Sequence, residues 1–223
     1  MKKLLFWMVL IIGIVALIGS CAKKDDETAA TAAADNTTST TSTTSYISTT
    51  TTASGSITMG DDTLSGVYAS ECLTSASTIA FFKATGFWAS EVNAYGQVFV
   101  VTGSDNISIE LYAFTDTSCS NLSQCQKTVS DNVTFGSASG SNYPVTYNNQ
   151  TQALTVHTTA AETALETLYS NALDFIVGTP IELPVSGSGL RYGLWTLSGT
   201  TWYEASSSSA TPTSAGTVPH VKQ

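Results

Sequence analysis

The chain has 223 residues, 42% of them hydrophobic, which is enough for one domain with its own core. It carries 8 Lys and Arg against 17 Asp and Glu, a net charge of −9 at pH 7. A surface this acidic repels phosphate backbones and anionic lipid headgroups. The composition therefore argues against a nucleic-acid-binding protein and against purely electrostatic membrane binding.

The N-terminus has the three-part layout of a secretory signal. Positively charged Met1-Lys2-Lys3 is followed by an apolar run from Leu4 to Ile18, then by small Gly19 and Ser20 before Cys21. The apolar run is shorter than the roughly 20 residues of a spanning helix, although an uncleaved membrane anchor is the alternative interpretation.

The sequence Ile18-Gly19-Ser20-Cys21 resembles the lipobox of bacterial lipoproteins. The resemblance implies cleavage before Cys21, a diacylglycerol thioether on its sulfur and a further acyl chain, such as palmitate, on the freed amine. Two or more acyl chains anchor a protein firmly to a membrane. The expected location is the bacterial cell envelope, with the chain lipid-anchored to the outer membrane.

The chain is predicted to have four parts. Thr28 to about Ser56 is almost entirely Thr, Ser and Ala, which offers little apolar surface to offset the entropy of ordering. We therefore assign 1–20 to a signal peptide, 21–56 to a lipidated N-terminus and disordered tether, 57–205 to a β-barrel-like domain and 206–223 to a C-terminal tail.

Hydrophobic residues in the domain recur mostly with a period of two. Ile107, Ile109, Leu111 and Ala113 share one face of a run, as do Leu154 and Val156 of another, which predicts half-buried strands. Turn signals separate this strand-like pattern into short runs. The sequence predicts a mainly β fold, an antiparallel barrel or sandwich of about eight to ten strands. The other runs predicted as strands are Ser65–Ser70, Thr78–Ala84, Phe87–Ala94, Gln97–Thr102, Thr128–Phe135, Tyr143–Tyr147, Leu190–Leu197 and Thr201–Ala205.

One segment has helical spacing instead. Ala161, Leu165, Leu168 and Ala172 lie three or four residues apart, and Thr159 with Glu162 fits a capping box. The pattern predicts one amphipathic helix near 159–173 that packs on the sheet. From Ser206 onward we expect a loop with a short edge segment at most.

Several short motifs resemble small lipocalin-like bacterial lipoproteins. The opening Leu64-Ser65-Gly66-Val67-Tyr68-Ala69-Ser70-Glu71-Cys72 is similar to their first strand, and Tyr112–Cys119 to a later element. The helical run Thr159–Leu165, the aromatic Trp202-Tyr203-Glu204, Pro212-Thr213 and the closing Lys222-Gln223 also match. The resemblance implies a lipocalin-like barrel with a ligand cavity and no established reaction. A further cysteine pair of that family is missing around Asn171–Phe175.

Three cysteines remain once Cys21 is assigned to lipid: Cys72, Cys119 and Cys125. An exported chain makes a disulfide the default, but the spacing leaves Cys72–Cys119, Cys119–Cys125 and Cys72–Cys125 all open, with one cysteine left over. The family resemblance favours Cys72–Cys119, which would stabilise the fold by about 2–4 kcal/mol. The spacing does not suit a metal site.

The ionisable residues predict no catalytic set, and we expect no enzyme and no cofactor. His157 is expected on the polar face of a strand and His220 in the tail, without a nucleophile elbow nearby. Glu91 and Glu110 are expected on strands, where they could face a cavity, and Asp61-Asp62 on a loop.

Aromatic side chains on predicted strands are expected to fill a sheet core, and some could line a pocket if the sheet closes. Arg191 is expected at the surface, with a buried ion pair or a ligand anchor as the alternatives. Two functions follow: a non-catalytic barrel that binds a small apolar or amphipathic ligand, or a surface module that binds a protein partner. The first predicts a central cavity lined by aromatic side chains, and a closed, filled core would contradict it. The second predicts no cavity but an exposed apolar patch or an unpaired strand edge. The aromatic residues are Phe81, Phe82, Phe87, Trp88, Phe99, Tyr112, Phe114, Trp195, Trp202 and Tyr203.

Overall fold

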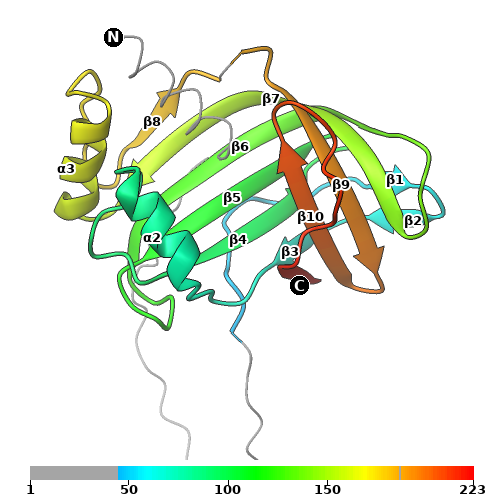
Figure 1. The fold of residues 1–223 in the computed structure, drawn as a ribbon, viewed down its shortest axis with the longest axis horizontal. Coiled ribbons are helices and arrows are strands. Elements are labelled where there is room, and N and C mark those ends of the chain that lie inside the picture. The colour runs from blue at the N-terminus through cyan, green and yellow to red at the C-terminus, as the bar shows by residue number, and fades with distance from the viewer. Residues whose placement is uncertain (1–44, 186) are drawn as a thin grey trace, which may run out of the picture.

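The computed structural model of the chain describes residues 45–185 and 187–223 (Figure 1). The predictions made for the signal peptide, for Cys21 and for the start of the tether fall outside these residues. Within them the fold is mainly β, as predicted, and the alternation of residues along the strands decides which side chains face the core.

Eight antiparallel strands close into a barrel, because β6 pairs with β7 as well as with β5. The barrel prediction is confirmed over the sandwich. Around the barrel the order is β6-β5-β4-β3-β11-β10-β9-β7. The strands are β3 (Val67–Ala69), β4 (Ala94–Val101), β5 (Ile107–Phe114), β6 (Leu122–Phe135), β7 (Asn142–Val156), β9 (Leu190–Ser198), β10 (Thr201–Ser207) and β11 (Pro219–Lys222).

Three further strands lie outside the closed barrel. The hairpin of β1 (Ile57–Met59) and β2 (Asp62–Leu64) forms its own two-stranded sheet and buries Ile57, Met59 and Leu64. The short β8 (Pro180–Leu183) pairs with the second half of β7, where β9 has left that edge. Figure 1 shows this hairpin at one end of the barrel and both helices at the other.

The C-terminal segment differs from the expected tail. β11 pairs with β10 on one side and with β3 on the other, so it completes the barrel between them. The polar Ser and Thr residues that suggested a tail form only the connection from β10 to β11, residues 208–218.

The helix α3 (Thr159–Leu168) confirms the predicted amphipathic helix, although it ends earlier than expected. The expected cap, Thr159, is wrong, because Thr159 is the first residue of the helix. The N-cap is Thr158, whose Oγ1 accepts a hydrogen bond from the Ala161 amide at 3.1 Å. Ala161 and Leu165 are completely buried, which packs the apolar face onto the barrel end.

The strand predicted over Thr78–Ala84 is wrong, because this run lies in the helix α2 (Ala76–Ala84). Ser75 caps its N-terminus, and Ile79 is buried beneath it. The strand predicted over Phe87–Ala94 is also wrong: most of this run forms turns, which bury Trp88, before β4 begins at Ala94. Aromatic residues pack equally well from a helix or a strand, so composition did not distinguish the two.

The last part of the expected tether contacts the barrel. We call residues 46–54 the strap. The Ile47 amide donates to the Ser70 carbonyl at 3.1 Å, and the Ser54 amide to the Val101 carbonyl at 2.9 Å. Ile47 packs on the outer face of β4 at Gly96, where any side chain would collide with it. The strap therefore covers an apolar cluster on the outside of the barrel.

Candidate ligand-binding site in the barrel

The inner face of β6 carries polar side chains where a barrel core is usually apolar. Gln124, Gln126, Thr128 and Ser130 alternate along the strand, and each is at most 1% exposed. Gln126 lies opposite Leu111 of β5 and Leu154 of β7, two residues of the main core, so these polar side chains face inward. We call these four residues the polar column.

Most side-chain hydrogen-bonding atoms of the polar column have no partner among the described residues. The Gln124 Nε2 atom donates to the Phe87 carbonyl at 3.1 Å, and the Ser130 hydroxyl donates to Asn149 Oδ1 at 2.9 Å. Both amide atoms of Gln126, the Oε1 of Gln124 and the hydroxyl of Thr128 find no hydrogen-bond partner in the described part of the chain. Each such buried group costs about 1–3 kcal/mol, so a hydrogen-bonding partner at these atoms would be stabilising.

Aromatic rings form another part of the interior. The Trp202 ring centroid lies 4.6 Å from those of Phe99 and Trp195, and Tyr68 meets Trp202 edge-on at 5.4 Å. Counted around the barrel, β10 is three strands from β6 in one direction and five in the other, so Trp202 projects from nearly the opposite wall. The indole Nε1 atoms of Trp195 and Trp202 also lack a partner among the described residues. The interior is thus aromatic on one side and polar on the other.

His220 belongs to this interior and not to a frayed tail. It is 1% exposed on β11, and its ring nitrogens lie 3.3 Å from the Trp202 carbonyl oxygen and 3.3 Å from Gln97 Oε1. Burial lowers the pKa of His220 to about 4, because the charged ring would lose its hydration. The histidine is therefore neutral at physiological pH.

Glu204 is an ionisable interior residue that sequence reasoning did not single out. It lies on β10 opposite Trp195, and burial raises the pKa of its carboxyl to about 7. The same burial raises the pKa of the neighbouring Tyr147 and lowers that of Arg191, which is 6% exposed. The expectation that Arg191 lies at the surface is wrong.

The two carboxylates considered for a cavity have separate structural partners. Glu110 is 1% exposed but lies on the outer face, beneath the strap. It accepts hydrogen bonds from the hydroxyls of Thr49 at 2.5 Å, Tyr112 at 2.5 Å and Thr51, and Lys127 Nζ lies 3.7 Å away. This carboxylate fastens the strap to the barrel.

Glu91 lies in the turns before β4 and not on a strand. Its Oε1 atom accepts hydrogen bonds from Ser123 at 2.9 Å and from Thr158, the cap of α3, at 2.5 Å. His157 follows β7, and burial lowers its pKa. Asp61 and Asp62 are exposed at the β1–β2 turn. The described residues include no group of three potential metal ligands.

The disulfide expected from the family resemblance is present. Cys72 and Cys119 are joined at 2.07 Å between sulfurs, with their Cα atoms 5.8 Å apart. Cys125 is completely buried on the outer face of β6, and none of the described cysteines is a free thiol. The expectation of a leftover thiol is therefore not met in residues 45–223.

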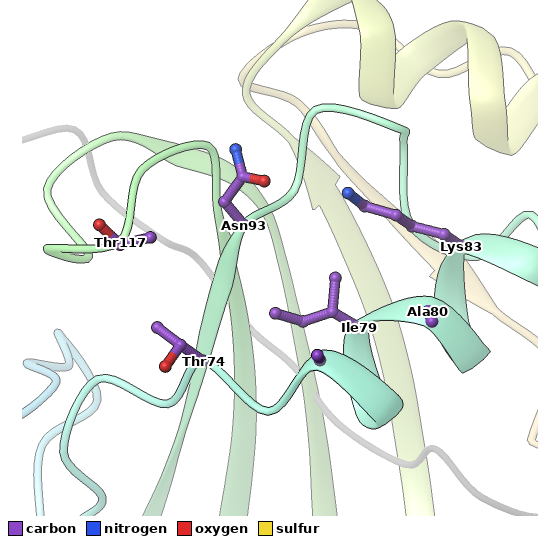
Figure 2. A pocket seen from close by; sticks show the side chains of 7 residues that line it. Thr74, Ile79, Ala80, Lys83, Asn93 and Thr117 are labelled. Atoms are coloured by element: carbon purple, nitrogen blue, oxygen red, sulfur yellow. The ribbon is translucent and has the colours of Figure 1, made fainter.

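A surface pocket of about 400 Å³ lies outside the barrel, beside α2 (Figure 2). Its lining is mostly short side chains with one amine, and it includes none of the interior aromatic rings. It is bounded by Thr74, Ala76, Ile79, Ala80, Lys83, Asn93 and Thr117.

Neither described helix is long and apolar enough to cross a bilayer. No protein-family model matches the chain, and no curated protein matches its sequence. The resemblance to lipocalin-like lipoproteins therefore stays a prediction, with the closed barrel as its structural counterpart.

Proposed function

We propose that the chain is a bacterial envelope lipoprotein, anchored through an acylated Cys21, whose non-catalytic barrel binds a small amphipathic molecule. One observation carries the binding proposal: buried polar atoms with no partner among the described residues face inward on β6, while closely packed aromatic rings occupy nearly the opposite wall. Buried polar atoms in proteins are nearly always paired. A molecule with one polar and one apolar side would pair them and keep contact with the rings.

Native mass spectrometry of the full chain purified from its host tests this proposal. We expect a small molecule of fixed mass that stays bound under gentle ionisation and leaves when the barrel unfolds in urea. A chain that has only its own mass under every gentle condition would contradict ligand binding.

The second candidate is a surface module that binds a protein partner. It is favoured by exposed apolar side chains, since Phe81 of α2 is 43% exposed and Ile176, beyond α3, is 55% exposed. The strand edge supports it less, because β8 is short and carries Pro180 and Glu182, which disfavour further pairing. Co-purification of a protein without a small molecule would favour this candidate.

A further inference from the structure

We infer that the polar column selects an uncharged ligand that presents a hydrogen-bond donor beside an acceptor, as a carboxamide or lactam does. The inference rests on the proposed function, because it names the chemistry of the molecule held in the barrel. Gln126 is the residue that makes the selection, with Thr128 and Gln124 beside it.

The state of Gln126 points to a ligand with both hydrogen-bonding roles. A glutamine side chain offers an acceptor oxygen and a donor nitrogen, and in Gln126, which is 1% exposed, neither has a partner among residues 45–185 and 187–223. Its cross-strand neighbours are Leu111 and Leu154, which cannot hydrogen-bond through their side chains. An amide-like edge satisfies both atoms at once, whereas a lone acceptor or a lone donor leaves one of them unpaired.

The neighbours of Gln126 extend the same chemistry along the strand. The hydroxyl of Thr128 and the side-chain oxygen of Gln124 also lack a partner in the described part of the chain, so three inward positions in a row offer hydrogen-bonding atoms. Gln124 is held in place, since its nitrogen already donates to the Phe87 carbonyl at 3.1 Å. At the end of the column near α2, Gln124 is held by a hydrogen bond, whereas at its centre the amide of Gln126 has no partner among the described residues.

The charges around β6 exclude an ionic ligand group at this wall. The polar column has no charged member, and the nearest ion pair, Glu110 with Lys127, lies on the outer face of the sheet. The interior ionisable residues Arg191, Glu204 and His220 lie on β9, β10 and β11, on the aromatic side. A carboxylate or ammonium beside Gln126 would lose its hydration without gaining a counter-charge, which is strongly unfavourable.

Three ring compounds of similar size test the inference: benzamide, benzoate and toluene. Each is titrated calorimetrically into the full chain in lipid nanodiscs, with empty nanodiscs as the blank. We expect benzamide to bind roughly tenfold more tightly than toluene, the ratio for a net gain near that of one or two hydrogen bonds. Benzoate should bind more weakly than either.

Two variants assign the effect to the column. Gln126→Met keeps the length of the side chain and removes both hydrogen-bonding atoms, so benzamide should lose about tenfold in affinity while toluene does not. Thr128→Val is a second, smaller change for use if the first variant does not fold. Gln150→Met makes the same substitution at an exposed position of β7 and should leave all three affinities unchanged.

The outcomes separate this inference from the proposed function. If toluene binds as tightly as benzamide, or if the Gln126 and Thr128 variants keep the wild-type preference, the barrel binds ligands but the amide selection is wrong. If none of the three compounds binds and no small molecule co-purifies with the chain, the proposed function fails and the inference fails with it.

Discussion

Removal of the Cys72–Cys119 disulfide should destabilise the barrel by an amount that follows from the length of chain it closes. The two cysteines are 47 residues apart and enclose α2, β4 and β5. For a loop of this length the chain-entropy relation gives a loss of about 14 cal/mol/K, or about 4 kcal/mol at 25 °C. We therefore expect the Cys72→Ala, Cys119→Ala double variant to lose about 4 kcal/mol in its free energy of unfolding.

Urea unfolding followed by tryptophan fluorescence measures this loss. Trp88, Trp195 and Trp202 are each at most 2% exposed, so their emission reports exposure of the core. The matched control is a reductant that opens the disulfide: wild type and double variant should then unfold at the same urea concentration, whatever else the reductant changes. A difference below about 1 kcal/mol between the oxidised proteins, with equal slopes in urea, would refute the loop-closure reasoning.

Glu110→Ala should cost about 1–3 kcal/mol, since the hydroxyls of Thr49 and Tyr112 lose the carboxylate to which they donate, while the partly buried Lys127 keeps its hydrogen bond to Thr51. Hydrogen exchange should be faster in the strap, and unchanged protection would contradict the role of Glu110 as its fastener. The pKa of Glu204 is raised to about 7 from an ordinary 4.5, so between these pH values the folded state keeps a proton that the unfolded state releases. The contribution of Glu204 to the free energy of unfolding therefore falls as the pH rises from about 4.5 to about 7. His220 has the opposite effect, because burial lowers its pKa to about 4 from 6.5. Its contribution to the free energy of unfolding is lost as the pH falls from about 6.5 to about 4. In the Glu204→Gln variant only the effect of His220 remains, so its free energy of unfolding, measured in urea, should rise with pH. A variant whose free energy of unfolding depends on pH as that of the wild type does would contradict the raised pKa of Glu204. Cys21→Ser should abolish acylation, measured by the intact mass of the mature chain, and membrane retention, measured by cell fractionation. A wild-type chain in which Cys21 is not acylated but forms a disulfide with Cys125 would contradict the lipid anchor.

The sequence was most informative where side chains alternate regularly between core and exterior. Ile107, Ile109 and Leu111 of β5 do face the core, as their alternation predicts. The expectation that this strand is half-buried is wrong, because all eight of its residues are buried and its outer face lies beneath the strap. The helix α3 was predictable from its apolar spacing, although the residue that caps it is Thr158 and not Thr159.

The inward-facing polar column of β6 was not predictable, because it reverses the usual pattern of apolar residues inside and polar residues outside. On β6 the polar residues Gln124, Gln126 and Thr128 face inward, whereas alternation rules place such residues outside. Glu110 was misjudged for a related reason: it is buried, but beneath a strap that composition alone suggested was disordered. In both cases the environment is set by contacts with segments far away in the sequence.

The position of β11 also determines when the barrel can close during synthesis. β3 has only three residues and gains its second partner from β11, some 150 residues later in the chain. β4, β5, β6 and β7 can pair as successive hairpins as they emerge, but the outer edge of β3 stays open until β11 arrives. Such contacts between distant segments slow folding, and an unpaired edge invites pairing with other chains. A nascent chain of this protein should therefore be most prone to aggregation after β7 has formed and before residue 222 is available.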